Sequence, residues 1–317
     1  MTADMMRKVN RLTRRQRSLI TRSQAFFIGL TDAQITALLK QQLWSEIRPG
    51  VYAVAGAAPS RDQAVLAVLL SAGEGAYASH RTTAFMYHVR RVELPESIDV
   101  VTALDRRVML DGVNGHRSRE LFDADLTVHA GIPTVSAARA LIDIAGSFRH
   151  DDVGKALDDL LRRRVCTLDD VRRCAGRLHA GPGRSLRTVH DVLSERWAGY
   201  DPGESDLETR ALRAIAKAGL PLPKQQHRIR LGGKQVRIDL AYPELKIAIE
   251  VDSWEYHGQR SSFDCDHIRR DELILLQWVP FTFTATMTDD YMAESTRTLI
   301  EHARARLSHK IDESGAA

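Results

Sequence analysis

The spacing of hydrophobic positions changes along the chain, and its first stretches predict a small domain of helices followed by a hairpin. Thr31 and Gln34 form a capping box in front of a helical pattern of apolar positions. Residues 43–54 then alternate as two short strands around a turn at Pro49-Gly50. Helices followed by such a hairpin predict a winged helix-turn-helix over residues 1–56, a fold that places its second helix in the DNA major groove.

The pattern becomes mixed over residues 57–200. Residues 64–70 have helical periodicity, whereas residues 98–102 and 126–128 have the composition of strands. The remainder, from residue 151, is helical and carries mixed charges that are typical of a solvated helix face. We therefore expect a mixed α/β middle domain that ends in a helical connector.

The last third of the chain returns to alternation. Ser205 is a candidate N-cap for a helix that ends near Gly219, and three strand-like stretches follow it within residues 225–252. This order predicts a third domain over residues 201–308, with a disordered tail over 309–317. The expected class is α/β, in the multidomain α+β sense, with a mixed sheet flanked by helices in the third domain.

Composition narrows the class of protein without giving its function. Apolar residues make up 44% of the chain and charged residues 27%, as in soluble globular proteins. No apolar run is long enough to cross a bilayer, and no secretory signal is recognisable. Cys166, Cys174 and Cys265 have neither disulfide nor zinc spacing. These features predict a cytoplasmic protein with reduced thiols and no membrane partner.

Positive charge is concentrated at the N-terminus. Residues 1–50 hold nine basic residues against three acidic ones, a local surplus of six that exceeds the +4 of the whole chain. Phosphate backbones attract such a segment, so we expect DNA as a partner. The candidate DNA-binding residues are Arg14, Arg15, Arg17, Thr36, Lys40, Gln41 and Arg48.

Acidic residues gather on the predicted strands of the last third. Asp239 interrupts an apolar strand, and Glu250 and Asp252 lie two apart, on one face of the next strand. An antiparallel hairpin brings these positions together, so Asp239, Asp252 and Glu250 are candidate ligands for Mg²⁺ or Mn²⁺. His257 is a candidate general base, and Glu208 can approach from the helix. The candidate catalytic residues are therefore Glu208, Asp239, Asp252 and His257.

The motifs IDLAYPELKIAIEVDSWEYH and DCDHIRRDELILLQW resemble the Vsr-like branch of the PD-(D/E)XK nucleases, over about a third of the chain. The resemblance implies a mixed sheet flanked by helices and Mg²⁺-dependent cleavage of DNA. It places Asp239 at the metal-binding Asp of the family, His257 at the later catalytic His and Glu208 at the helical Glu. Asp252 stands where the superfamily usually has Lys, two residues after Glu250, and Ser253 stands where the family commonly has Gly.

The segment GLTDAQITALLKQQLWSEIRPGVYAV resembles the N-terminal domain of AbiEi-type antitoxins and related regulators. The similarity continues through Ala78–Ala84 and Gly131–Ala145. It implies DNA binding by a winged helix and, as a further partner, a toxin-like or operon protein. Ser79 and His80 lie in this region and are expected to cap a helix and pack.

Two functional hypotheses from different classes follow. One is a DNA-binding endonuclease that hydrolyses phosphodiester bonds with a divalent metal. The other is a non-catalytic transcriptional regulator or AbiEi-type antitoxin with a degenerate nuclease domain, which the missing Lys after Glu250 favours. RNA is an alternative substrate, because nothing in the sequence indicates recognition of a 2′-hydroxyl.

Overall fold

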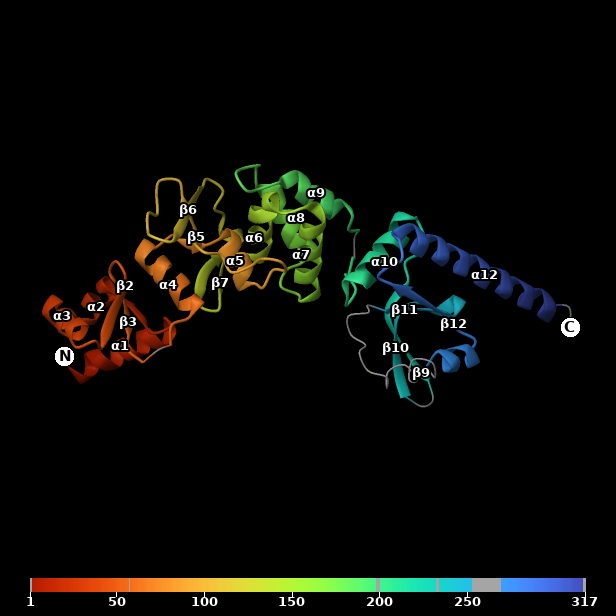
Figure 1. Ribbon diagram of the computed structural model, residues 1–317, viewed down its shortest axis with the longest axis horizontal. Coiled ribbons are helices and arrows are strands. Elements are labelled where there is room, and N and C mark those ends of the chain that lie inside the picture. The colour runs from red at the N-terminus through yellow and green to blue at the C-terminus, as the bar shows by residue number, and fades with distance from the viewer. Residues whose placement is uncertain (1, 57, 198–199, 232–233, 253–268, 316–317) are drawn as a thin grey trace. The chain divides into compact units, whose positions relative to one another are not determined.

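The computed structural model describes residues 2–56, 58–197, 200–231, 234–252 and 269–315 (Figure 1). The chain divides into two compact units, Met1–Arg196 and Trp197–Ala317. The predicted boundaries lay after residues 56 and 200. The first of these does not separate two compact units, because the wing and the middle segment pack together.

The first segment has the topology of a winged helix-turn-helix. Its sheet has the order β1-β3-β2, with both pairings antiparallel. Thr31 and Gln34 form the predicted capping box of α3. Strand β1 was not predicted, because three residues are too short to show a period. The elements are α1 (Ala3–Arg15), β1 (Leu19–Thr21), α2 (Arg22–Ile28), α3 (Asp32–Lys40), β2 (Trp44–Arg48) and β3 (Val51–Val54).

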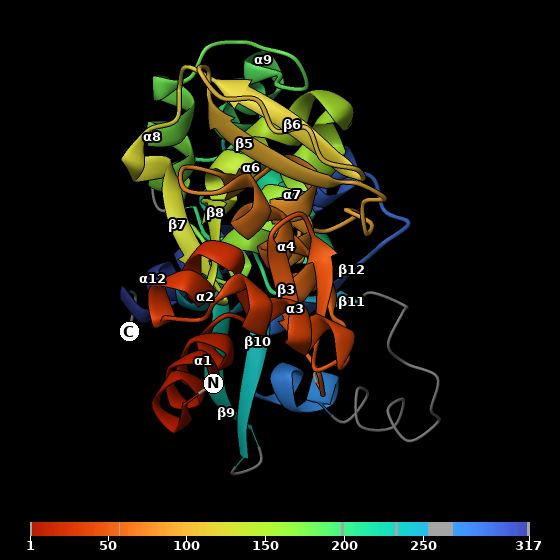
Figure 2. The ribbon, with the colours of Figure 1, turned by 90° about the vertical axis from the view of Figure 1, so that its left-hand side faces the viewer.

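A mixed five-stranded sheet forms the middle segment, in the order β6-β5-β4-β8-β7. Figure 2 shows β5 beside β6 and β7 beside β8. The helices α7, α8 and α9 follow it. The elements are α4 (Arg61–Ala72), β4 (Tyr77–Ala78), α5 (His80–Met86), β5 (Ile98–Ala103), β6 (Val113–Ser118), β7 (Leu126–His129), β8 (Ile132–Val135), α6 (Ala137–Ile144), α7 (His150–Arg162), α8 (Leu168–Arg177) and α9 (Leu186–Ser194).

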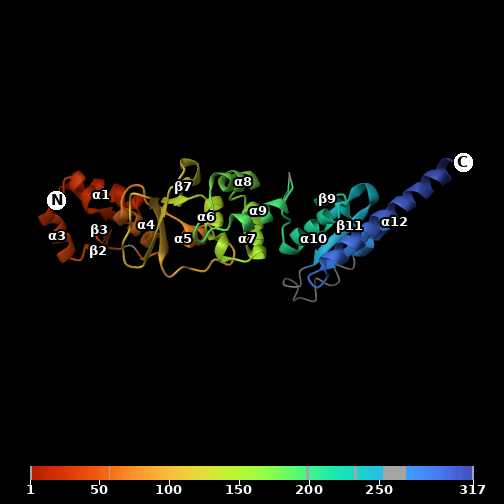
Figure 3. The same cartoon turned by 90° about the horizontal axis from the view of Figure 1, so that it is seen from above.

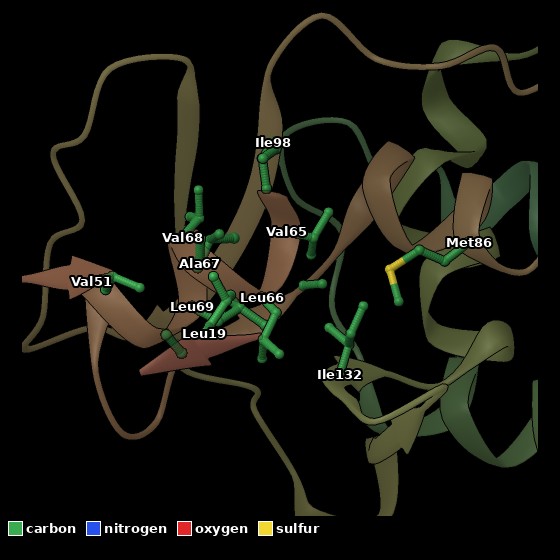
Figure 4. Close-up of a cluster of buried hydrophobic side chains, with 13 residues drawn as sticks. Leu19, Val51, Val65, Leu66, Ala67, Val68, Leu69, Met86, Ile98 and Ile132 are labelled. Carbon is green, nitrogen blue, oxygen red and sulfur yellow. The ribbon is translucent and has the colours of Figure 1, made fainter. Parts of the chain in front are cut away.

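One apolar core joins these two segments. Leu19 of β1 and Val51 of β3 pack with Val65 and Val68 of α4 and with Ile98 of β5 (Figure 4). Burial of this shared face explains why the first 196 residues form a single compact unit.

The second unit is built on a four-stranded sheet of order β12-β11-β10-β9. The first three strands in sequence are antiparallel, whereas β11 and β12 are parallel. Helices α10 and α12 pack on it (Figure 3). The tail predicted from residue 309 is instead helical up to Gly315, since no helix-breaking residue interrupts α12 before that point. The elements are α10 (Asp206–Lys217), β9 (Lys224–Leu231), β10 (Lys234–Tyr242), β11 (Ile247–Asp252), β12 (Val279–Thr284) and α12 (Asp289–Gly315).

Candidate active site and nucleic-acid interface

Glu208 occupies the first turn of α10 and is held from three sides. Ser205 caps the helix by accepting the Glu208 N–H at 3.1 Å. The Glu208 carboxylate accepts the Glu204 N–H at 3.0 Å, and the residue is only 5% exposed. Gly203 lies so close that a Cβ there would sit 2.3 Å from the Glu208 Cβ. The position therefore requires glycine, because any side chain would displace the carboxyl group.

Asp239 lies on β10 at the point where the β10–β11 pairing opens. The register pairs Leu240 with Ile249, and the Asp239 carboxylate accepts the Val251 N–H at 2.9 Å. The hairpin thus brings Asp239 to the segment that carries Glu250 and Asp252, as the sequence predicts.

The Asp239 carboxylate acts electrostatically on the carboxyl group of Glu208. Burial raises the pKa of Glu208, and the negative charge of Asp239 raises it further. Hydrogen bonds from Glu204, Ser205 and Gln226 oppose this shift. Within the described ranges, no Lys, Arg or His forms an ion pair with either carboxylate. Glu208 is buried and Asp239 is half-buried, so in the described part of the chain the two carboxylates concentrate negative charge without a basic partner.

Gln226 of β9 is the residue of this site that the sequence did not indicate. Its backbone has φ +49°, in the left-handed region that non-glycine residues seldom adopt. Its amide donates to the Glu208 carboxylate at 2.8 Å, while its buried Oε1 has no hydrogen-bond partner. In the alternating pattern of residues 225–231 it is one more edge-strand position, so no sequence signal marked it.

Glu250 and Asp252 differ in their surroundings although they share a strand face. Glu250 accepts a hydrogen bond from Arg269 at 2.7 Å, and the same guanidinium group donates to the Arg237 carbonyl. The Arg269 Nε is buried without a partner. Asp252 is exposed at the end of β11, beside Thr284 of β12. Arg269 thus supplies positive charge near Glu250, where the strand carries Asp252 in place of Lys.

These residues fit a hard divalent cation in part. Glu208, Asp239 and the partnerless Gln226 Oε1 offer oxygen ligands, which Mg²⁺ prefers, and Mg²⁺ needs few protein ligands because it keeps several waters. In the part of the chain that the structure describes, no three His, Cys, Asp or Glu side chains form a ready metal cluster. The predicted trio of Asp239, Asp252 and Glu250 is therefore not assembled there. His257 lies outside the described residues.

The predicted DNA-binding residues fall into two groups. Thr36, Lys40 and Gln41 are exposed on and after α3, and Arg14 and Arg15 are exposed on the last turn of α1. The other two make contacts within the unit.

Arg17 donates to the Ala130 carbonyl at 2.8 Å and pairs with Asp62 at 2.9 Å. Arg48 donates to the Asp111 carbonyl at 2.6 Å. These two arginines hold the winged helix against the middle segment, so the exposed group is the better candidate for nucleic-acid contact.

Ser79 and His80 pack as predicted, but Ser79 does not cap α5 with its side chain. Ser79 Oγ instead lies 3.0 Å from His80 Nδ1, and the His80 ring stacks on His116 with centroids 3.7 Å apart. His116 is in turn bonded to Asp99 at 2.9 Å. His80 has φ +46°, and burial lowers its pKa to about 4. A fully buried Ser79 has no access to substrate, so this group is structural.

Comparisons with known proteins identify relatives of the chain but no family. Two uncharacterized proteins of Mycobacterium tuberculosis, MT2308 of strain CDC 1551 / Oshkosh and Rv2248 of strain ATCC 25618 / H37Rv, are each 26% identical over 66% of this chain and 74% of their own length. The crystal structure of the RV2827C protein from Mycobacterium tuberculosis is similar over 72% of this chain and 89% of its own, with 16% identity and a TM-score of 0.39. No family model matches. Among the described residues, no helix is both long and apolar enough to cross a membrane.

Proposed function

We propose that this protein is a DNA-binding phosphodiesterase of the Vsr-like kind that uses Mg²⁺ or Mn²⁺ in the cytoplasm. The observation that carries the proposal is the pair of buried Glu208 and half-buried Asp239, which has no basic partner in the described ranges. The repulsion between two nearby carboxylates falls when they share a proton or bind a cation. The partnerless Oε1 of Gln226 adds a third oxygen at the same place.

In this proposal each residue has a separate task. Asp239 and Gln226 hold the cation, Glu208 binds it directly or orients a water, and waters complete the oxygen set. The metal would supply the positive charge that stabilises a phosphoryl transition state and lowers the pKa of a water. Arg269 offsets the charge of Glu250 and places a guanidinium group, which can pair with a substrate phosphate, beside this strand. His257 remains the candidate general base.

A winged helix in the same chain supports DNA rather than RNA as the substrate. Thr36, Lys40 and Gln41 are exposed at the helix that such folds place in the major groove. The cleavage test described below also includes RNA as a second substrate.

A DNA-binding regulator or AbiEi-type antitoxin is the second candidate. The ion pair between Arg269 and Glu250 favours it, because Glu250 is already neutralised without a metal. A regulator needs only the winged helix, so its DNA affinity would not depend on the acidic pair.

The test is cleavage of supercoiled plasmid and of a labelled RNA by the full chain, with Mg²⁺, with Mn²⁺ and with EDTA. Asp239→Asn should reduce metal-dependent cleavage by at least about 100-fold, since it removes a ligand charge. Asp290→Asn, an exposed aspartate on α12, is the matched control and should cleave normally.

Titration of Mg²⁺ by calorimetry gives a second readout that does not need turnover. Failure of the native chain to cleave, with Mg²⁺ binding absent or unchanged in Asp239→Asn, would contradict the proposal. Retained, salt-sensitive DNA binding in that case would favour the regulator.

A further inference from the structure

A groove runs between α1 and α2 of the winged helix. Its volume is about 610 Å³, and its apolar lining comes from Leu12, Phe27 and Ile28. Lys8, Arg11 and Arg15 line the same groove from α1. None of its lining residues belongs to α3 or to the β2–β3 hairpin, and Arg15 is the one candidate DNA-binding residue that it shares.

Phe27 is the most unusual residue of this groove. It is 94% exposed, whereas Ala25 two positions earlier is completely buried. The adjacent Phe26 is partly covered by the Arg22 guanidinium, 5.5 Å from its ring centroid. Among the described residues no ring or guanidinium covers Phe27 in this way. An isolated exposed aromatic is common, but one that borders an apolar groove has the form of a binding anchor.

The basic side chains of the groove lie on one face of α1. Lys8, Arg11 and Arg15 are spaced three and four residues apart, about one helical turn each. Lys8 pairs with Asp4 at 2.8 Å. Arg11 and Arg15 make no ion pair within the described ranges, and like charges one turn apart destabilise a helix. An acidic partner would remove this repulsion.

We propose that this groove docks an acidic amphipathic helix of a partner protein. The apolar lining would bury the anchors of that helix at spacings of three and four residues, and its acidic flanks would meet Arg11 and Arg15. Lys8 to Arg15 spans about 10 Å of helix axis, which two turns of a bound helix match. A nucleic-acid backbone gains nothing from Leu12, Phe27 and Ile28, so the lining favours a peptide.

The probe is a fluorescent helical peptide of about 18 residues with Leu anchors and Glu flanks, titrated into the full chain at about 50 mM salt. A second peptide carries Lys in place of each Glu. The acidic peptide should bind, and Phe27→Ser should weaken it by at least about 10-fold. The double variant Arg11→Glu, Arg15→Glu should lose the acidic peptide and gain the Lys peptide, because the charges are then exchanged.

Two exposed substitutions serve as matched controls. Phe122→Ser and Arg187→Glu make the same chemical changes at exposed positions outside the groove and should leave binding unchanged. Circular dichroism checks that every variant is folded. DNA affinity should be unchanged in Phe27→Ser.

Three results would overturn the proposal. One is that the acidic peptide fails to bind or binds no better than the Lys peptide. Another is that duplex DNA displaces it in a Phe27-dependent way, which would make the groove part of the DNA surface. The third is that the groove is covered by a second copy of this chain, seen as a dimer that Phe27→Ser dissociates.

Discussion

Two clusters of charge in this protein, one buried and one partly buried, differ in how their carboxylates are neutralised. In the first unit, Arg139 donates to both oxygens of Asp143 at 3.0 and 2.9 Å, and Arg184 reaches the same aspartate at 2.7 Å. Arg196 holds both oxygens of Asp158 at 2.7 Å. In the second unit, Glu208 and Asp239 accept hydrogen bonds only from uncharged donors in the described ranges, namely amide groups and the Ser205 hydroxyl.

The difference separates a structural cluster from a candidate functional one. A buried charge is tolerated when an opposite charge and hydrogen bonds replace its water, and the first cluster satisfies this condition within the chain. The second cluster has no opposite charge among the described residues, so solvent or a bound ligand is left to offset its charge. The two sites therefore differ in charge balance, and also in burial, because Asp239 is half-buried whereas Asp143 and Asp158 are buried.

The largest expected effect comes from unbalancing the first cluster. Arg196→Met removes the guanidinium group that holds both carboxylate oxygens of Asp158, a residue that is 2% exposed, and should lower the free energy of unfolding by about 3–5 kcal/mol. Urea denaturation followed by fluorescence measures it. Adding Asp158→Leu should restore most of the loss, because an apolar pair can replace a buried ion pair.

Arg187→Met is the control, since its side chain is 94% exposed and should change stability by less than about 0.5 kcal/mol. Equal stability of the native chain and Arg196→Met would contradict the view that this cluster is balanced.

The first unit should also lose stability in acid through His80. Its folded pKa of about 4 lies below the ordinary 6.5, because burial disfavours the charged ring beside His116 and Arg139 despite Asp99 and Asp143. The unfolded chain therefore binds the extra proton first. The contribution of neutral His80 to stability is fully present above pH 6.5. The free energy of unfolding falls by up to about 3 kcal/mol as the pH is lowered towards 4.

His80→Asn should flatten this part of the pH profile, because asparagine tolerates the left-handed backbone and does not titrate. The exposed His190→Asn is the control and should keep the native profile. Stability of the native chain that is constant between those pH values would show that His80 is protonated without cost.

The comparison also shows what the sequence could predict. Asp239, Glu250 and Asp252 were recognisable because a charged residue in an apolar strand is conspicuous, and Ser205 and Glu208 because capping is local. The winged helix was recognisable from its capping box and turn.

Gln226 and Arg269 were not recognisable, since their importance comes from contacts 18 and 19 residues away in sequence, with Glu208 and Glu250. The balance of the first cluster was hidden for the same reason: Arg196 meets Asp158 across 38 residues. A local pattern reveals a charge, but only the tertiary fold reveals its partner.

A smaller effect is expected from crowding Glu208. Gly203→Ala would place a Cβ 2.3 Å from the Glu208 Cβ, so α10 or the loop must shift, at about 1–3 kcal/mol. Thermal unfolding measures the loss, and calorimetry with Mg²⁺ should show weaker binding. Gly176→Ala is the matched control, because it has nothing within 4 Å and lies in helix α8, where alanine is the better helix former. Unchanged stability and Mg²⁺ affinity in Gly203→Ala would mean that Glu208 is free to move and is not held for a ligand.

The smallest effect tests the unbalanced cluster itself and has the opposite sign. Glu208→Gln removes a buried charge that faces Asp239, so it should stabilise the folded chain at pH 7 by about 0.5–2 kcal/mol. The folded pKa of Glu208 is raised above the ordinary 4.5, so the native carboxyl group contributes stability below that pH and loses it as pH rises through the folded pKa. The advantage of the variant should therefore vanish below pH 4.5.

Saturating Mg²⁺ should also remove that advantage, by stabilising the native chain more than the variant. Glu294→Gln, whose carboxyl group is 72% exposed, is the control and should behave as native. A Glu208→Gln variant less stable than the native chain at pH 7 would mean that the glutamate has a positive partner after all. The acidic pair would then be a second balanced cluster, and the structural support for a metal at this place would be lost.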